Sequence, residues 1–424
     1  MLRRRAALRG RAQCVGYGMF NVFRKRARML ETTLRIRVAR SFADIDPAQW
    51  DACANPPGLT RDEHGERFNP FLTHAFLLAC EASGSATART GWGGAHLLVE
   101  GEDGRLRAAA PVYLKTHSQG EYVFDHGWAD AFERAGGDYY PKLQIAAPFT
   151  PATGRRLLIA ADTPAREAEA MTGLIAGLRA LREKAGASSI HVTFNPKAEW
   201  DALGEAGFLQ RTGQQFHFVN KGYADFDGFL ADLASRKRKM IKRERKDALA
   251  NGITIHKLTG AAITERHWDA FYGFYVDTGN RKWGTPYLTR KFFTLAGASM
   301  ADRILLIMAE REGRLIAGAI NFIGDDALYG RNWGAIEEHP FLHFEVCYYQ
   351  AIDFAIERGL ARVEAGAQGE HKLARGYGPV TTYSAHDIAD PRLRRAIEDY
   401  LVRERAHVEE ALEVYGEQAP FRKA

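Results

Sequence analysis

Apolar positions along the chain follow two periods, and both halves show them in a similar order. In the first half, apolar positions recur every three or four residues over 47–54, 69–83, 164–184 and 196–206, which predicts helices. Short apolar runs predict strands at 34–38, 95–100, 106–116, 122–125, 139–146, 189–194 and 214–219. The turn at 102–104 joins two of these strands as a hairpin.

The second half repeats the unit. Helices are expected over 267–280 and 288–299, followed by a hairpin of strands 304–310 and 315–323, a strand at 327–333, a helix from 342 to the Gly359 stop, a strand at 362–365 and a last helix at 391–415. The sequence therefore predicts an α/β fold (an α+β mixed sheet) built from two tandem units, residues 31–222 and 223–424.

A basic stretch opens the second unit. A helical pattern runs from 227 to 250 and places Arg236, Lys239 and Arg243 on one face. Eight cations with only Glu244 among them repel one another unless an anion lies close. The anion could be the phosphates of a nucleic acid, the pyrophosphate of a cofactor or carboxylates of the same protein. Alternatively, this face of the helix is merely solvated.

Composition places the chain among globular proteins. It has 424 residues, 46% hydrophobic content and a net charge of +6, and it contains no run of 18 apolar residues that could span a membrane. Residues 1–30 are rich in arginine and are expected to be a disordered basic extension. The four cysteines are far apart, which predicts free thiols in a cytoplasmic protein without a metal site.

Polar side chains gather where the last strands of the second unit end. Open sheets bind ligands at the carboxyl ends of their strands, and the residues after 365 are polar and glycine-rich. His343 and Glu345 begin a helix, where the helix dipole favours negative charge. The simpler interpretation is a solvated loop with helix caps.

Several segments resemble a known family. The hairpin, strand, helix and strand resemble the GNAT acyltransferase fold. Two such units with a basic helix between them resemble the FemAB-like family of peptidoglycan biosynthesis/recognition. The segments that carry the resemblance are YVFDHGWADA, YYPKLQIAAPFTPATGRRLL, SRKRKMIKRER, TGNRKWGTPYL, LHFEVCYYQAIDFAI and VEAGAQGEHKLARGY. The resemblance runs from residue 34 to the C-terminus. It implies an acyltransferase that forms an amide on an amine, such as one on a peptidoglycan precursor.

Acyl transfer requires a polarised carbonyl, a base for the incoming amine and an acid for the leaving group. Candidates for these catalytic roles are His343, Glu345, Glu364, the rival His371 and Tyr329. Candidates for substrate binding in the second unit are Arg331, Trp333, Tyr348, Gln368, Lys372 and Arg375. We expect the second unit to be the active one, because its strand ends are the more polar.

Further candidates for an acceptor groove are Asp125, His126, Lys142, Arg281, Lys282 and Trp283. Arg155, Arg236, Lys239 and Arg243 are candidates for binding the donor or its phosphates. Neither unit carries the Q/R-x-x-G-x-G/A loop that binds CoA in acetyltransferases. The resemblance therefore leaves acyl-CoA and aminoacyl-tRNA as alternative co-substrates, with no permanently bound cofactor. The oligomeric state stays open.

A rival hypothesis is a non-catalytic protein that binds RNA or an anionic cell-wall precursor through the basic helix. A hydrolase is a weaker alternative, since the sequence has no G-x-S-x-G motif and no paired metal ligands.

Overall fold

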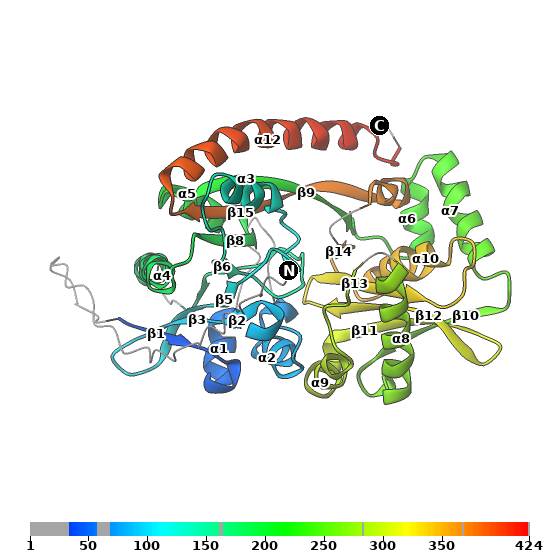
Figure 1. The fold of residues 1–424 in the computed structure, drawn as a ribbon. Coiled ribbons are helices and arrows are strands. Elements are labelled where there is room, and N and C mark those ends of the chain that lie inside the picture. The colour runs from blue at the N-terminus through cyan, green and yellow to red at the C-terminus, as the bar shows by residue number, and fades with distance from the viewer. Residues whose placement is uncertain (1–33, 57–67, 161–163, 282–283, 367–368, 423–424) are drawn as a thin grey trace, which may run out of the picture.

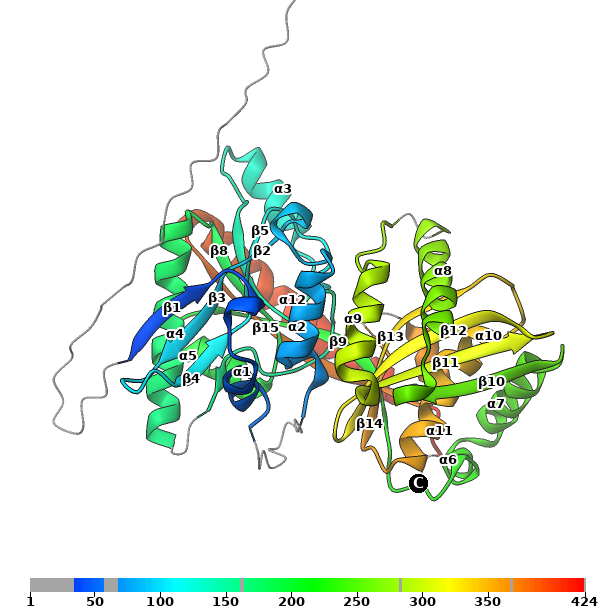
Figure 2. The ribbon, with the colours of Figure 1, turned by 90° about the horizontal axis from the view of Figure 1, so that it is seen from below.

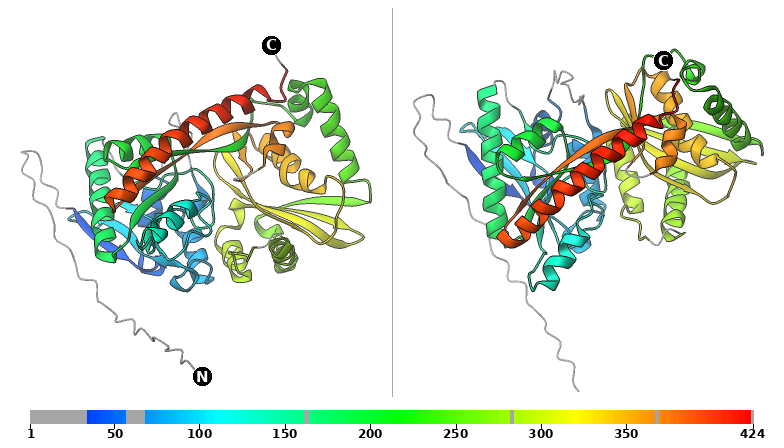
Figure 3. Two further views of the ribbon diagram at one scale, coloured as in Figure 1. Left: turned by 45° about the horizontal axis from the view of Figure 1, so that its top comes forward. Right: turned by 90° about the horizontal axis from the view of Figure 1, so that it is seen from above.

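The computed structural model describes residues 34–56, 68–160, 164–281, 284–366 and 369–422. They form two α/β halves that lie side by side and share one large sheet (Figure 1). The C-terminal helix lies across the strands that connect the halves, as the views in Figure 3 show. None of the described helices combines the length and the apolar character needed to cross a membrane.

The first half combines helices with strands, most of them short. They are β1 (Arg35–Ala39), α1 (Pro47–Ala54), α2 (His74–Ala82), β2 (Trp92–Gly94), β3 (His96–Glu100), β4 (Leu106–Ala110), β5 (Val112–Lys115), α3 (His126–Arg134), β6 (Lys142–Ile145), β7 (Leu158–Ile159), α4 (Pro164–Ala185), β8 (Ser189–Asn195), α5 (Lys197–Glu205) and β9 (Leu209–Val219).

The second half begins with two helices and ends with the longest one. Its elements are α6 (Phe226–Asp232), α7 (Ser235–Ala248), β10 (Ile253–Thr259), α8 (Glu265–Arg281), α9 (Arg290–Met300), β11 (Ile304–Arg311), β12 (Arg314–Ile323), β13 (Ala327–Ala335), α10 (Leu342–Phe344), a π-helical turn (Glu345–Tyr349), α11 (Gln350–Glu357), β14 (Arg362–Glu364), β15 (Tyr377–Ile388) and α12 (Pro391–Glu417).

The large sheet runs through both halves in the order β10-β11-β12-β13-β14-β9-β15-β8-β6-β5-β2, while β1-β3-β4-β7 form a small antiparallel sheet. Strand β9 belongs to the first half in sequence, yet it pairs with β14 and β15 of the second. Strand β15 in turn pairs with β8 of the first half. These crossing strands fasten the halves together by backbone hydrogen bonds. The predicted division at residue 222 stays a prediction, because the sheet itself crosses it.

Side chains also join the halves. Helices α2 and α9 face each other between them (Figure 2). Phe76 of α2 packs with its ring centroid 5.8 Å from that of Phe292 of α9. Phe71 lies 5.2 Å from Tyr329 and 5.0 Å from Phe322, measured between ring centroids. Because these buried aromatic residues belong to one apolar core, the relative position of the halves is fixed by packing.

Each half contains two parallel strands that pair over three residues and then separate. In the first half β6 pairs with β8, with Leu143 opposite Ile190. In the second half β13 pairs with β14, with Leu328 opposite Val363. A crossover helix connects the strands of each pair, α4 in the first and α11 in the second. The predicted mixed α/β fold with a repeated unit is thus confirmed.

Some local predictions were wrong. Residues 122–125 form no strand, and Tyr122 adopts a left-handed φ of 60° that breaks the extended run. The strand expected at 106–116 is divided at Pro111 into β4 and β5, which belong to different sheets, since proline cannot donate to a ladder. The basic helix 227–250 is divided into α6 and α7, because Leu233 is extended and bridges to Phe421.

Candidate active site

The parallel strands of the second half separate at a defined point. Strands β13 and β14 pair from Ala327 opposite Arg362 to Tyr329 opposite Glu364, and β13 then continues alone with β12. At that point Gly330 lies opposite Asn321 and Asn332 lies opposite Ile320, so the register skips Arg331. A β-bulge of this kind takes backbone groups of β13 out of the ladder where the strands form a wedge.

A cavity of about 90 Å³ occupies this wedge. Its lining includes Arg331 and Trp333 of β13, His343 of α10, and Cys347 and Tyr348 of the π-helical turn. Four of the residues predicted from sequence, Arg331, Trp333, His343 and Tyr348, are therefore brought together here. A second cavity of about 320 Å³ lies on the outer side and shares Trp333 and His343 with the first. A ligand could therefore enter the wedge through this outer cavity, beside the connection between β13 and α10.

Tyr348 and His371 form a hydrogen-bonded pair at the wedge, with the Tyr348 hydroxyl 2.8 Å from His371 Nε2. The ring of His343 lies between this pair and Trp333, with centroids 5.4 Å from Tyr348 and 5.2 Å from Trp333. Burial raises the pKa of Tyr348 above its usual range, so its hydroxyl keeps its proton at neutral pH. The arrangement can hold a proton on Tyr348 and resupply it through an imidazole.

The predicted candidates Tyr329 and Glu364 lie on the opposite face of the same strands. Leu328 and Val363 are packed in the core beneath α11. Because side chains alternate along a strand, Tyr329 and Glu364, which follow them, point to the face away from α11. On that face Arg362 lies 3.0 Å from Glu364 Oε1 and 3.5 Å from the Tyr329 hydroxyl. Tyr329 is therefore held in the core between the halves, and Glu364 is oriented by Arg362.

Only one of the two carboxylate oxygens of Glu364 is hydrogen-bonded among the described residues. Its Oε2 atom is buried without a hydrogen-bond partner among the described residues, and it lies 3.8 Å from His217 Nε2. Burial lowers the pKa of His217, although Glu364 opposes this effect. The same His217 nitrogen lies 3.2 Å from Gln215 Oε1. A polar chain therefore leads from the parallel strand pair along β9.

Glu345 does not line the wedge. It is fully buried, and its Oε1 lies 3.0 Å from Arg245 and 2.7 Å from Gln350 Nε2. Arg245 also pairs with Asp353 at 2.7 Å. Burial raises the pKa of Glu345 and the Arg245 charge partly offsets that effect. Because its oxygens are used in fastening α7 to the π-helical turn, we assign Glu345 a structural role rather than that of a base.

Arg375 is also held by α7. Its guanidinium lies 2.9 Å from the carboxylate of Glu244, which accepts a further hydrogen bond from the Tyr349 hydroxyl. The guanidinium also lies 3.4 Å from the centroid of the Phe344 ring and donates to the carbonyl of His371 at 2.7 Å. Arg375 therefore positions His371 and does not line the cavity.

Lys372 follows His371 and is buried. Its Nζ donates to the carbonyl of Gly366 at 3.0 Å. Burial lowers the pKa of Lys372 from 10.5 to about 8, with a smaller opposing effect of Cys347. The hydrogen bond to Gly366 therefore satisfies a buried ammonium whose burial is itself unfavourable.

The corresponding wedge of the first half is filled. Beyond the last parallel pair, Ile145 opposite Val192, the buried side chain of Arg156 occupies the space. Its guanidinium donates to the carbonyls of Ala152, Gly154 and Thr193 at 2.7, 2.7 and 2.9 Å. It also donates to the carbonyl of Arg155 at 3.3 Å, so a buried arginine with four carbonyl acceptors stands where the second half has its wedge cavity.

The predicted first-half residues Asp125 and Lys142 lie in a sealed network. Lys142 Nζ lies 2.5 Å from Asp125 and 2.6 Å from Glu121, and all three side chains are buried. Burial would raise the pKa of Asp125, but Lys142 outweighs it and holds the pKa below its usual range. His126 is exposed at the start of α3. The predicted donor-binding Arg155 instead hydrogen-bonds the carbonyls of Cys53 and Ala54.

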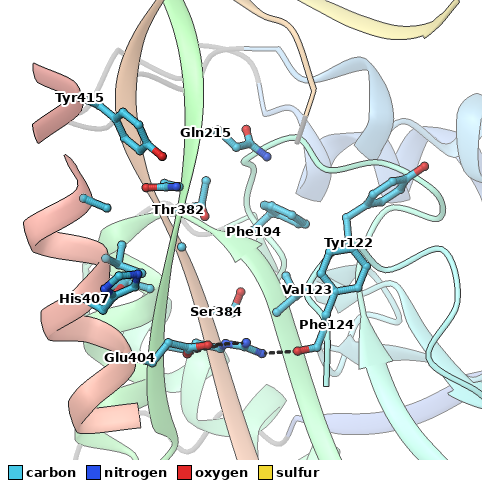
Figure 4. Close-up of a pocket in the computed structure, with 16 residues that line it drawn as sticks. Tyr122, Val123, Phe124, Phe194, Gln215, Thr382, Ser384, Glu404, His407 and Tyr415 are labelled. Atoms are coloured by element: carbon cyan, nitrogen blue, oxygen red, sulfur yellow. Dashed lines mark hydrogen bonds and ion pairs between the residues drawn. The ribbon is translucent and has the colours of Figure 1, made fainter. Parts of the chain in front are cut away.

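A third cavity, of about 310 Å³, lies at the junction of the halves (Figure 4). It is bounded by α12, by β9 and β15, and by the loop 122–124. Figure 4 shows Tyr122 and Phe194 on the side of the first half, and Glu404, His407 and Tyr415 on α12. The lining combines aromatic rings with amides and hydroxyls, which suits a hydrophilic ligand with hydrogen-bond donors and acceptors.

Arg331 lines the wedge cavity and reaches towards Tyr122, which lines the cavity at the junction of the halves. Its guanidinium lies 5.8 Å from the centroid of the Tyr122 ring, and it also hydrogen-bonds the carbonyl of Phe149. Tyr122, Phe149 and Phe194 have left-handed φ angles of 60°, 56° and 57°. Such strain in bulky residues is uncommon and concentrates at functional sites. The strained residues and the bulged strand therefore mark one region.

The remaining predicted residues lie elsewhere. Arg236, Lys239 and Arg243 are exposed on α7 and line neither cavity. Lys282, Trp283 and Gln368 fall outside the described residues, as does the side chain of Arg281. Within the described ranges no cluster of three or more His, Cys, Asp or Glu side chains could hold a metal ion.

Residues that sequence reasoning missed come from distant segments. His217, Glu244 and the α12 side chains reach the site through strand order and helix docking. No local motif marks them. The apolar pattern in β9 predicted a strand only over 214–219, whereas the strand spans Leu209–Val219.

The sequence matches the FemAB-like family, described as peptidoglycan biosynthesis/recognition, over residues 41–423. No curated protein matches it significantly. Among solved structures, FemX has a TM-score of 0.50 at 13% identity, covering 80% of this chain and 98% of FemX. A tandem GNAT protein from the clavulanic acid biosynthesis pathway has a TM-score of 0.44 at 13% identity, covering 84% of this chain and 99% of that one.

The L-PGS structure from Bacillus licheniformis has a TM-score of 0.47 at 11% identity, covering 81% of this chain and 99% of that one. At these identities the FemX likeness indicates the fold, and the family match covers most of the chain. This protein belongs to the FemAB-like family, described as peptidoglycan biosynthesis/recognition.

Proposed function

We propose that this protein transfers an acyl or aminoacyl group to an amine, and that the amide forms in the wedge between β13 and β14. The single observation that carries the proposal is the bulge at Arg331, which interrupts the ladder beside the wedge cavity. A carbonyl seated there would accept hydrogen bonds from backbone groups outside the ladder as negative charge develops on its oxygen.

The donor lies on the α11 side of the strands. As the carbon–oxygen or carbon–sulfur bond of the donor breaks, the Tyr348 hydroxyl gives its proton to the leaving atom. His371, 2.8 Å from that hydroxyl, returns a proton to Tyr348 afterwards. The geometry supports this role, because Tyr348 lines the wedge cavity and its hydroxyl lies within hydrogen-bonding distance of an imidazole that can resupply its proton.

The acceptor amine comes from the opposite face. On that face the Oε2 atom of Glu364 is buried and has no hydrogen-bond partner in the described ranges, and it takes the proton from the amine as the carbon–nitrogen bond forms. The cavity beside Tyr122 supports acceptor binding there, since Arg331 lines the wedge cavity and its guanidinium lies 5.8 Å from the centroid of the Tyr122 ring. Its polar and aromatic lining suits a hydrophilic amine, such as one carried by a peptidoglycan precursor.

The co-substrate is an activated acyl compound, acyl-CoA or aminoacyl-tRNA. Glu337 would repel donor phosphates near α10, but its carboxylate is occupied by Arg311, Arg314 and His339. Pairing with these side chains weakens the repulsion of donor phosphates by Glu337 and leaves Glu338 as the second acid that lines the outer cavity.

The test supplies the purified protein with two labelled donors in separate reactions, a ¹⁴C-aminoacylated tRNA pool and ¹⁴C-acetyl-CoA. Each reaction contains a cell-wall precursor fraction, and label in amide linkage is measured. We expect transfer from one of the two donors. Ala365→Leu, which adds bulk to the wedge, should abolish transfer, whereas the matched control Ala396→Leu at an exposed position of α12 should leave it unchanged. Transfer that survives in a folded Ala365→Leu variant would refute the location, and no transfer from either donor would refute the activity.

A further inference from the structure

The exposed face of α7 carries a row of cations that the proposed reaction does not use. Arg236, Lys239, Lys242, Arg243 and Lys246 are all exposed, whereas Ile241, Glu244 and Ala248 on the other face are buried against the second half. Lys242 pairs with Asp227 and Arg243 with Asp247. For Arg236, Lys239 and Lys246 the described residues provide no ion pair. The charge of this face therefore stays available to a partner.

The row of cations ends in apolar side chains. Leu249 follows Lys242 and Lys246 at helical spacing and is 37% exposed. Ile336 and Phe341, in the connection between β13 and α10, are 48% and 36% exposed. Asn251 Nδ2 lies 3.2 Å from His339 Nδ1, so this connection and the C-terminal end of α7 lie side by side. We call Leu249, Ile336 and Phe341 the apolar tip.

The position of this surface is peripheral. Figures 2 and 3 show α7 at the outer end of the second half, away from the junction with the first. The hairpin between β11 and β12 reaches the same end, because Arg311 and Arg314 bond to Glu337 of the connection. Phe341 has a left-handed φ of 61°, which is strained for a phenylalanine.

We infer that the α7 cations and the apolar tip form a docking surface for a bilayer containing anionic phospholipids. An anionic bilayer attracts lysine and arginine at its surface and accepts apolar side chains at the boundary of its acyl chains. A nucleic acid would use the cations and could stack a base on Phe341, but it would gain little from the aliphatic side chains of Leu249 and Ile336. The combination of charge and exposed apolar groups therefore favours the lipid surface over RNA.

Docking in this orientation has a consequence for the proposed reaction. The outer cavity, lined by Trp333, Glu337, His339 and His343, opens beside Ile336. If the wedge is the active site, its outer approach would face the lipid surface. The docking inference itself does not depend on the reaction, and its test measures binding alone.

The experiment measures sedimentation of the full chain with vesicles of 70% phosphatidylcholine and 30% phosphatidylglycerol, and with pure phosphatidylcholine vesicles. We expect binding to the first and little binding to the second. Arg236→Gln/Lys239→Gln/Lys246→Gln should weaken binding about a hundredfold, since each cation near an anionic surface contributes about fivefold. Leu249→Ser/Ile336→Ser should weaken it by about tenfold or more.

The charge-matched control is Arg392→Gln/Arg395→Gln/Arg403→Gln on α12, whose arginines are exposed far from α7. This control should bind as the wild type does, and circular dichroism should show that every variant is folded. The inference is wrong if anionic vesicles do not bind, or if Leu249→Ser/Ile336→Ser binds them unchanged. It is also wrong if vesicle binding is absent while a fluorescein-labelled RNA binds through the same three cations.

Discussion

The buried carboxylate of Glu244 provides a sharp test of how α7 supports the site. It is 6% exposed and accepts from both Arg375 Nη2 at 2.9 Å and Arg375 Nε at 3.1 Å, as well as from the Tyr349 hydroxyl. Arg375 in turn donates to the carbonyl of His371, the partner of Tyr348. Loss of the carboxylate should therefore affect stability and the position of His371 together.

Glu244→Gln keeps the shape of the side chain and leaves the Arg375 charge buried without an anion. Removing one partner of a buried ion pair costs about 3–5 kcal/mol, because the remaining charge is desolvated without compensation. We expect a loss of that size in the free energy of unfolding measured by urea titration. Glu244→Gln/Arg375→Met should recover most of it, since the second change removes the stranded charge.

The control is an exposed pair of the same kind. Lys257 and Glu357 are 2.6 Å apart with side chains 30% and 55% exposed. Glu357→Gln should cost less than about 1 kcal/mol. If Glu244→Gln costs no more than Glu357→Gln, or if the double variant is less stable than the single one, then α7 is not held to the second half by this carboxylate and the reasoning fails.

Lys372→Met should stabilise the protein at pH 7 by up to about 3 kcal/mol, because burial lowers the Lys372 pKa from 10.5 to about 8. Between pH 8 and 10.5 the unfolded chain binds one more proton than the folded protein, so the wild-type free energy of unfolding should rise with pH in this window. The same rise in Lys372→Met would contradict the burial argument. Arg156→Met should destabilise the first half by about 3 kcal/mol or more, because it removes the hydrogen-bond donor from four carbonyls; an unchanged urea midpoint would show that the first half does not depend on this side chain. Arg331→Met should raise KM for the amine acceptor more than for the donor, since Arg331 links the wedge to the cavity at Tyr122; an increase confined to the donor KM would place the acceptor elsewhere.

The repeated unit could be predicted from apolar periodicity because its strands and helices bury one face each. The last strand could not. Residues 377–388 carry glycine, proline, two threonines and a serine, and they resemble a loop in isolation. They form β15 because β9 and β8 flank them on both sides. Strand partners that come from both halves supply the hydrogen bonds that local propensity does not predict.

The candidate site was predicted in part for a similar reason. His343 and Tyr348 follow β13 closely in sequence, so their approach to the wedge could be anticipated from strand and helix order. Glu345 was expected beside them as a base, but the basic helix turns its arginine towards that carboxylate. The cations of α7 are thus divided between internal carboxylates and solvent, a division that depends on helix rotation and not on charge count.

In the proposed reaction, acyl transfer takes place in the second-half wedge with Tyr348 as acid and Glu364 as base. The most direct measurement is the rate of amide formation by Tyr348→Phe and Glu364→Gln under saturating donor and acceptor. Tyr383→Phe, a partner of Trp200 outside the wedge, and Glu100→Gln, a partner of Arg37, are the matched controls. We predict a loss in kcat of about 10²–10⁴ for each site variant, with wild-type rates for both controls. Wild-type kcat in folded Tyr348→Phe and Glu364→Gln would contradict the account.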